Sequence, residues 1–394
     1  MEYSAKYSAT VQTIFQDHFW SFQVENPLPA YKRKAAEAIM KCRTDLMGGH
    51  RIECDNHHPN GCAYNSCKHR ACPQCAFIHA QQFMDDKKAR LLDCQYYHLV
   101  FTLPHELSDL YLYNPKVMGD LLLSCATHTV FKFLSNDDHL GATPGLMASL
   151  HTNGRNCSIH PHCHILCTAG GLAPEGWRPL PKPTFFLPEP AVEKMFRCRF
   201  LDLLKTMLQN DTLRAPPDKT QQQVLNTIET TYQKHWHLRF IGPFDYGHGV
   251  IAYLSRYVKG GPIRNAQLDY YDGQHITFTF TDHHTEERTT LRLSAHEFIR
   301  RFLLHVPPLR MRTFRMYGIF HNHCKKKLNR CRKCLGQNPY VPAPSFDWID
   351  FLVSKGLETR TQCSICGAPL RRVKRIPPLA RSDHIYQNDS APSC

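Results

Sequence analysis

The chain has 394 residues, enough to bury a substantial core and to divide into several units. Its 48 Lys and Arg outnumber its 34 Asp and Glu, and the formal net charge of +14 favours a polyanionic partner. No signal-peptide pattern begins the sequence and no apolar stretch approaches the length of a membrane span, so we expect a cytoplasmic protein without a membrane partner. In a reducing compartment the 18 cysteines are not expected to form a disulfide framework, and their pairwise clustering indicates zinc.

The first half of the chain predicts helices, then a cysteine-rich segment, then strands. Val11, Ile14 and Phe15 are spaced as the apolar face of a helix. After the cysteine-rich segment, residues 96–102 predict a strand that ends before Pro104, and residues 107–134 predict a helical stretch.

A β-hairpin follows, with strands over 149–152 and 158–168 around a turn at 153–156. Its second strand contains His162-Cys163-His164, and residues two apart on a strand share a face. The two imidazoles therefore point the same way, and together they form half of a divalent-metal site. His160 is a candidate further ligand, but the sequence leaves the third ligand open.

The second half of the chain predicts more helices and a second hairpin. The expected elements are a helix over 192–208, a polar linker over 210–222, a helix over 248–258 closed by Lys259-Gly260-Gly261-Pro262, strands over 267–271 and 275–280 around Asp272-Gly273, and a helix over 294–304.

Tyr253 and Tyr257 lie four residues apart on the expected helix, and so on one of its faces. A phenol, with a pKa of about 10, is a poor nucleophile at neutral pH unless it is activated. A divalent ion that binds phosphate oxygens makes the phosphorus more electrophilic and orients it for in-line attack. Arg256, between the tyrosines, could contact the same phosphate. Imidazoles on a sheet and phenols on a helix together favour covalent cleavage of a nucleic-acid strand.

Two groups of cysteines predict structural zinc, about two ions per chain. The N-terminal group offers five candidates for four positions, so at least one is not a ligand: Cys54, His57, Cys67, Cys72 and Cys75. Cys62, His58 and His69 compete for the same positions. The C-terminal group has the spacing of a zinc ribbon with a long insertion: Cys331, Cys334, Cys363 and Cys366.

Basic residues accompany the C-terminal cysteine pairs. Lys325, Lys326 and Lys327 precede the first pair, and Arg371 and Arg372 follow the second. Held in place by zinc, such side chains could follow a phosphate backbone, so we expect them to bind DNA.

In this order, the motifs resemble those of insertion-sequence transposases of the two-tyrosine, His-hydrophobic-His class, the insertion sequence ninety-one type. Residues 64–75 look like the family's N-terminal zinc-binding domain, and residues 160–164 look like its metal motif. The other matching segments are residues 98–104 for its first catalytic strand, 253–257 for its tyrosine helix, and 298–306 and 315–318 for its later signatures. The family usually has cysteine where this chain has His57.

The resemblance implies an α+β fold: a ferredoxin-like antiparallel sheet with helices and an N-terminal zinc-binding domain, to which the cysteine spacing adds a C-terminal zinc-ribbon-like module. It implies Tyr253 and Tyr257 as nucleophiles and His162 and His164 as ligands of a catalytic Mg²⁺ or Mn²⁺. The resemblance implies a bacterial DNA transposase that is cytoplasmic and associated with the nucleoid. It would nick and join single-stranded or hairpin DNA at the ends of a mobile element through a 5′-phosphotyrosine, by a rolling-circle mechanism.

Two other functions are compatible with the same motifs. A plasmid or phage replication initiator of the same nickase class would keep the chemistry, whereas a non-catalytic zinc DNA-binding protein would not. The N-terminal zinc segment and the later signatures favour the transposase. The expected organisation is a helical region (1–50), a zinc-binding domain (51–90), a catalytic domain (91–285), a helical and basic extension (286–330) and a C-terminal module with a basic tail (331–394).

Overall fold

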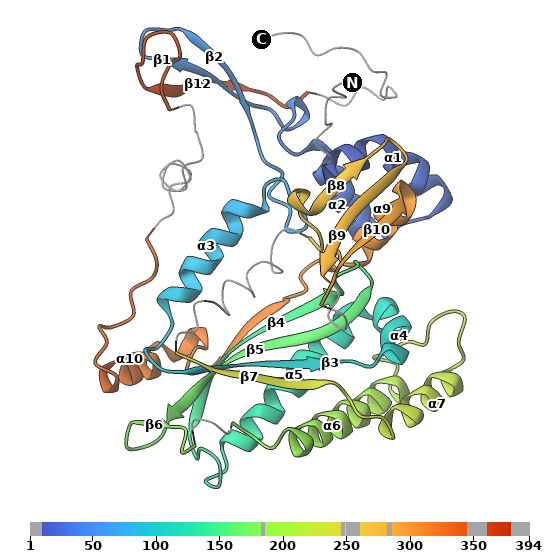
Figure 1. The fold of residues 1–394 in the computed structure, drawn as a ribbon, viewed down its shortest axis with the longest axis vertical. Helices are drawn as coiled ribbons and strands as arrows, with labels where there is room; N and C mark the ends of the chain where they lie inside the picture. Colours follow the sequence, from blue (N-terminus) through green and yellow to red (C-terminus); the bar gives the residue numbers. More distant parts are fainter. Residues whose placement is uncertain are drawn as a thin grey trace.

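The computed structural model describes residues 10–182, 186–245, 249, 261–281, 286–344 and 361–379 (Figure 1). The strands are β1 (Gly49–Cys54), β2 (Pro59–Tyr64), β3 (Tyr96–Thr102), β4 (Thr143–Asn153), β5 (Ile159–Leu172), β6 (Trp177–Pro179), β7 (Leu238–Phe244), β8 (Leu268–Tyr271), β9 (His275–Thr281), β10 (Arg288–Ser294), β11 (Phe314–Gly318) and β12 (Leu370–Ile376). The α-helices are α1 (Val11–Glu25), α2 (Ala30–Lys41), α3 (Ala76–Ala89), α4 (Ser108–Tyr113), α5 (Pro115–Leu134), α6 (Glu189–Gln209), α7 (Gln221–Tyr232), α9 (Ala295–Leu304) and α10 (Lys325–Cys334).

These strands form three antiparallel sheets. The largest has six strands in the order β11-β4-β5-β3-β7, with β6 paired to β5. The other two have the orders β10-β9-β8 and β12-β1-β2. The six-stranded sheet lies at one end of the long axis of the molecule and β12-β1-β2 at the other (Figure 1).

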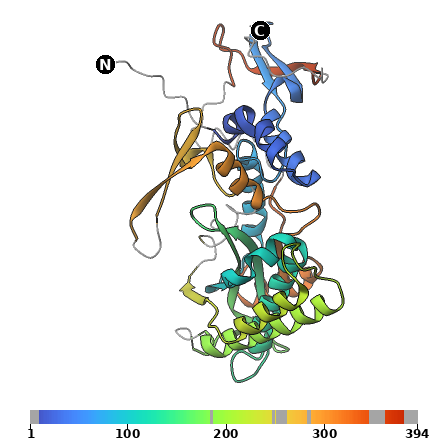
Figure 2. The ribbon, with the colours of Figure 1, turned by 90° about the vertical axis from the view of Figure 1, so that its right-hand side faces the viewer.

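One face of the six-stranded sheet is covered by helices α5, α6 and α7 (Figures 1 and 2). Alternate residues of β5, such as Cys163 and Ile165, pack there in an apolar cluster with Leu122 of α5 and Phe196 of α6. Helix α5 is long and apolar enough to cross a membrane, but 61% of its most apolar window is buried within the protein. It is therefore packed as a core helix is.

The opposite face of the same sheet has two parts. At one end, Leu166 of β5 and Met147 of β4 pack with Leu328 and Cys331 of α10. Helix α3 also reaches this face, since the rings of Phe83 and Phe314 meet edge to face with centroids 4.8 Å apart. The other end of the strands carries histidines.

A second apolar cluster joins the two N-terminal helices to the sheet β10-β9-β8. Phe15 of α1 packs edge to face on Phe302 of α9, with ring centroids 5.3 Å apart. Ser294 caps α9 by accepting a hydrogen bond from the backbone N–H of Glu297. Strands β8, β9 and β10 and helix α9 are therefore packed on the N-terminal helices, although the neighbouring strands along the chain, β7 and β11, lie in the six-stranded sheet.

The third sheet joins distant parts of the sequence. Strand β12 pairs antiparallel with β1, with Gly49 opposite Ile376 and Cys54 opposite Leu370. The residues expected to form a basic tail thus include a strand.

Several expectations are confirmed and others are incomplete. The hairpin β4–β5, the hairpin β8–β9 and helices α6 and α9 form where the sequence predicts them. The stretch 107–134 is divided instead, because Pro115 begins a new helix after Asn114. The sequence did not predict strands β1, β2, β6, β7, β10, β11 and β12 or helices α3, α7 and α10. The expected helix over 248–258 lies outside the described residues, apart from position 249.

The carboxylate of Glu193 links α6 to the start of β7. It is buried, with 7% of the residue exposed, and it accepts hydrogen bonds from Arg197 Nε at 2.9 Å and the Trp236 backbone N–H at 3.0 Å. Arg197 also donates to the carbonyl of Tyr232 at the end of α7.

We predict that Glu193→Ala lowers the free energy of unfolding by about 3–5 kcal/mol, because it leaves a half-buried guanidinium without its counter-ion. Glu229→Ala is the matched control: its partner is Lys205, its side chain is 61% exposed, and the expected loss is below about 1 kcal/mol. Urea unfolding of both variants measures the difference. Equal losses of unfolding free energy would contradict a stabilising role for the hydrogen bonds of Glu193.

Candidate active site and cysteine clusters

Three histidines meet on the open part of the six-stranded sheet. His162 and His164 lie on one face of β5, and His151 of β4 lies directly opposite His162 in the antiparallel register. One ring nitrogen from each of the three imidazoles lies within 4.8 Å of the others. The ring centroids of His151 and His164 are 4.3 Å apart, and those of His162 and His164 are 4.7 Å apart. We call these three residues the histidine cluster.

Neighbouring groups orient two of the three rings. His162 Nδ1 lies 2.6 Å from the carbonyl oxygen of His160. A carbonyl only accepts, so Nδ1–H donates and the lone pair of His162 is on Nε2. On the other side, His98 Nε2 of β3 lies 2.8 Å from His164 Nδ1. Hydrogen bonds of this kind to the second ring nitrogen are typical of metal-binding histidines.

Burial keeps these imidazoles neutral. It lowers the pKa of His162 and of His98 to about 4, and it lowers the pKa of His151 and His164 well below the usual value. Repulsion between the neighbouring rings lowers the pKa of His151 and His164 further. The neutral form is the one that binds a metal ion, so the cluster is ready to do so at neutral pH.

The third member of the cluster is His151, whereas the sequence suggested His160 as a candidate. His160 is exposed and contributes its carbonyl oxygen to His162 rather than a ring nitrogen to the cluster. The paired strands and their turn were the signal that could have found His151. A β-bulge between His151 and Asn153 shifts the register, however, so counting back from the turn does not identify the residue opposite His162.

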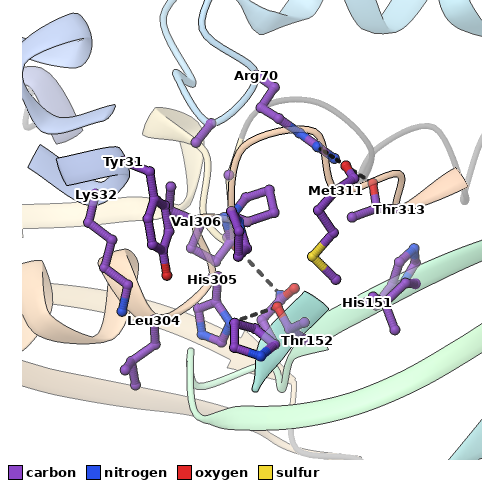
Figure 3. Close-up of a pocket in the computed structure, with 18 of the residues that line it drawn as sticks. Tyr31, Lys32, Arg70, His151, Thr152, Leu304, His305, Val306, Met311 and Thr313 are labelled. Carbon is purple, nitrogen blue, oxygen red and sulfur yellow. Dashed lines mark hydrogen bonds between the residues drawn. The ribbon is translucent and has the colours of Figure 1, made fainter. Parts of the chain in front are cut away.

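A small pocket opens beside His151 (Figure 3). Tyr31 and Lys32 of α2 line one side of it, and Thr152 of β4 lies on another. His305 also lines the pocket: its Nδ1 lies 3.0 Å from Thr152 Oγ1, and its Nε2 lies 3.0 Å from the Cys157 carbonyl oxygen. Burial lowers the pKa of His305 to about 4.

A second pocket continues from the first, since Asn153, Gly261 and Pro262 line both. It lies between the tip of the β4–β5 hairpin and the sheet β10-β9-β8. Its charged lining residues are all arginines: Arg155, Arg264 and Arg288. We call this second pocket the arginine groove. It extends the pocket beside His151 along a positively charged surface.

The two tyrosines, and Arg256 between them, lie outside the described residues. The described residues end at Asp245, directly after β7, and apart from position 249 they begin again at Gly261. Gly261 lines the pocket beside His151.

The first cysteine cluster consists of Cys42, Cys67, Cys72 and Cys75, whose sulfur atoms all lie within 4.8 Å of one another. Cys67 Sγ and Cys75 Sγ are 3.7 Å apart. Two thiolates bound to tetrahedral zinc at about 2.3 Å would be separated by about 3.7 Å. The sulfur of Cys67 also accepts the backbone N–H of His69 at 3.4 Å, as in a metal-binding knuckle.

The second cluster consists of Cys54, His58, Cys363 and Cys366, again with all ligand atoms within 4.8 Å. It combines the loop between β1 and β2 with the segment before β12. The amide of Asn60 donates to Cys363 Sγ at 3.4 Å and lowers the pKa of this thiol to about 6.

The structure corrects the groupings expected from the sequence. Cys67, Cys72 and Cys75 come together, but their fourth member is Cys42 at the end of α2, which sequence reasoning missed because it belongs to no CxxC pair. Cys54 lies in the other cluster, and the histidine beside it there is His58, not His57. His57 occupies the turn, with φ of 61°.

Cys331 and Cys334 belong to neither cluster, so the expected ribbon of four cysteines does not form. Both lie on α10, where Cys331 is fully buried among apolar residues and Cys334 is exposed. Burial raises the pKa of Cys331 to about 11, as expected of a thiol that packs as a small apolar side chain. Cys363 and Cys366 meet Cys54 instead, because β12 pairs with β1.

The expected DNA-binding residues of the C-terminal region form two separate exposed patches. Lys325, Lys326 and Lys327 begin α10, beside the six-stranded sheet. Arg371 and Arg372 lie on β12 at the other end of the molecule (Figure 1), and Arg371 Nε pairs with Asp55 at 2.9 Å.

Comparisons with known proteins identify the family. A family model described as "Putative transposase" matches residues 145–327, which include the β4–β5 hairpin and the tyrosine pair. A second, described as "Transposase zinc-binding domain", matches residues 14–103, which include the first cysteine cluster. No solved structure is similar to the chain at a significant level.

Two curated relatives match most of the chain. "Putative transposase y4qJ" of Sinorhizobium fredii is 33% identical over 350 residues, 86% of this chain and 87% of the relative. "Transposase for insertion sequence element IS801" of Pseudomonas savastanoi pv. phaseolicola is 28% identical over 342 residues, 84% and 80% of the two chains. This protein therefore belongs to the insertion sequence ninety-one family of transposases, enzymes of DNA transposition.

Proposed function

We propose that this transposase nicks and rejoins single-stranded DNA at the ends of a mobile element by a rolling-circle route, with tyrosine nucleophiles and a divalent metal ion. The observation that carries the proposal is the histidine cluster. Three neutral imidazoles converge beside a pocket and an arginine-lined groove in a chain that belongs to a transposase family.

The residues of the histidine cluster fit a divalent metal ion. His151, His162 and His164 supply three nitrogen donors, which leaves further coordination positions for phosphate oxygens. The expected ion is Mg²⁺ or Mn²⁺, and an all-nitrogen donor set favours the softer Mn²⁺ of the two. When bound there, the ion would polarise the scissile phosphate and orient it for in-line attack.

Tyr253 and Tyr257 are the proposed nucleophiles. Tyr257 precedes Gly261 by four residues in the sequence, and Gly261 lines the pocket beside His151, which supports this proposal. The phenolate oxygen would bond to phosphorus as the bond from phosphorus to the 3′-oxygen breaks, which leaves a 5′-phosphotyrosine and a free 3′-OH. A 3′-OH of another strand would then displace the tyrosine and reseal the DNA without a nucleotide cofactor.

The DNA strand would reach the histidine cluster along the arginine groove. Arg155, Arg264 and Arg288 line it, and guanidinium groups pair well with phosphates. DNA farther from the site would be contacted by Lys325–Lys327 on α10 and by Arg371 and Arg372 on β12. Arg256, between the two tyrosines in the sequence, would contact the scissile phosphate. Single-stranded or hairpin ends are the proposed substrates.

Purified protein incubated with end-derived single-stranded oligonucleotides and Mn²⁺ should form a protein–DNA adduct that resists SDS and heat. The adduct should disappear in the double variant Tyr253→Phe/Tyr257→Phe, which keeps the rings and removes only the hydroxyl groups. Denaturing gels measure it. An adduct that persists in the double variant would exclude these nucleophiles, and tight binding with no adduct in the wild type would favour a non-catalytic DNA-binding role.

We predict that His151→Ala and His162→Ala each lower the nicking rate at least about 100-fold in Mn²⁺, because each removes a metal ligand. DNA affinity should change little, since the metal acts mainly on the transition state. His160→Ala is the matched control: it removes an exposed imidazole of the same strand and keeps the carbonyl that orients His162. An equal loss in His160→Ala, or normal nicking in His162→Ala, would contradict the assignment.

Replacing Arg264 or Arg288 by Ala should weaken binding to single-stranded DNA and reduce the salt dependence of the affinity. Each lost phosphate contact lowers the slope of log K against log[salt] by about 0.7. Lys194→Ala removes the same charge from an exposed position on α6, on the opposite face of the sheet, and should leave the slope unchanged. Fluorescence anisotropy across salt concentrations measures these slopes. If all three variants behave alike, the groove is not the path of the DNA.

A further inference from the structure

We propose that Cys54, His58, Cys363 and Cys366 bind one zinc ion in a composite centre shared by the N-terminal hairpin β1–β2 and the C-terminal strand β12. Cys54 and Cys366, whose sulfur atoms lie 3.6 Å apart, are separated by 312 residues in the sequence. Each half supplies two ligands, and neither half is a complete zinc site alone.

The distances between the ligand atoms match tetrahedral zinc. Cys54 Sγ lies 3.6 Å from Cys366 Sγ and 3.5 Å from His58 Nδ1. Cys363 Sγ lies 3.8 Å from the same ring nitrogen. With zinc–sulfur bonds of about 2.3 Å and a zinc–nitrogen bond of about 2.0–2.1 Å, tetrahedral geometry gives separations of about 3.5–3.8 Å.

Groups around the four ligands are those expected of zinc thiolates. The backbone N–H of His58 points at Cys54 Sγ and that of Ile365 at Cys363 Sγ, both at 3.4 Å. The amides of Asn56 and Asn60 donate to Cys366 Sγ and Cys363 Sγ, also at 3.4 Å. Each of these four donors would stabilise a thiolate, the form of cysteine that binds zinc.

Each of the two knuckles that hold the ligands is closed by a short-range backbone hydrogen bond and contains a residue with positive φ, although the two turns differ in length. After Cys54, the N–H of His57 donates to the Cys54 carbonyl at 2.9 Å, and His57 has φ of 61°. After Cys363, the N–H of Gly367 donates to the Cys363 carbonyl at 2.9 Å, and Gly367 has φ of 71°. The pairing of Cys54 with Leu370 then brings the knuckles face to face.

The sheet β12-β1-β2 has little else to hold it together. Among the described residues, none of its three strands contributes to any of the apolar clusters of the protein. Strand β12 is exposed over Arg371–Arg375. A small sheet without a core depends on a metal ion or a cross-link for stability. The composite centre would supply this metal ion and would fix the basic strand β12 in place.

Zinc content of the full-length protein tests the ligand set. Cys363→Ser/Cys366→Ser should bind one zinc fewer per chain than the wild type. Cys331→Ser/Cys334→Ser, which removes the other C-terminal pair, should bind as many as the wild type. The proposal is overturned if the first variant keeps the full zinc content or if the second loses an ion.

Cysteine alkylation followed by mass spectrometry tests whether the centre is shared between the two ends of the chain. In the wild type Cys54 should be protected, and in Cys363→Ser/Cys366→Ser it should react as fast as a free thiol. Continued protection of Cys42, Cys67, Cys72 and Cys75 in the same sample shows that the variant is folded. If Cys54 stays protected while these four remain protected, a shared centre is excluded.

The histidine ligand has its own control. His58→Ala should release one zinc to a chelator at least about 10-fold faster than the wild type, whereas His57→Asn, which tolerates the positive φ of the turn, should release it at the wild-type rate. The reverse order would overturn the assignment of His58.

Discussion

The antiparallel pairing of β4 with β5 is the constraint on which the candidate active site depends. Side chains alternate between the faces of a strand, so a register shift of one residue would turn His151 away from His162 and His164. The apolar residues of both strands prevent such a shift. Leu150, Cys163 and Ile165 must face α5 and α6, and this requirement leaves the histidines on the other face. The same core that stabilises the sheet therefore assembles the histidine cluster, and burial among these strands keeps its imidazoles neutral.

The cysteine clusters have the complementary role of organising the parts that lack a large core. The first joins the end of α2 to the knuckle before α3, and its residues also pack with the aromatic cluster of α1 and α9. Arg70, in the same knuckle, donates to the carbonyl of Met311 at 2.8 Å in the wall of the pocket beside His151. A zinc ion here would thus act on the site indirectly, by holding one wall of that pocket.

The sequence predicted what depends on local patterns and missed what depends on long-range pairing. The hairpin, the shared face of His162 and His164, and the segment Cys67–Cys75 follow from periodicity and short spacing. Cys42 and His151 were missed because each is a single residue whose partners come from another element. Cys331 and Cys334 show the opposite error, because their CxxC spacing predicted zinc ligands that do not join a cluster. They lie on an amphipathic helix, where Cys331 packs in the apolar core. A spacing pattern states which residues are close along the chain, and only the sheet pairing of β12 with β1 decides which pairs meet.

The β-bulge opposite Thr152 lies in β5, where His160 and Pro161 face a single residue of β4, and it separates the register of the histidine cluster from that of the hairpin tip. Up to His151, β4 must keep its register with β5 so that the imidazoles converge. Beyond it, Asn153 and Arg155 must face the sheet β10-β9-β8 to line the arginine groove. A regular hairpin has a single alternation and would fix both orientations together. The extra residue lies in β5 and bends that strand, so the tip of the hairpin can turn toward the groove while the histidines stay in place. The irregularity that hid His151 from sequence reasoning is therefore the feature that connects the proposed metal site to the proposed path of the DNA.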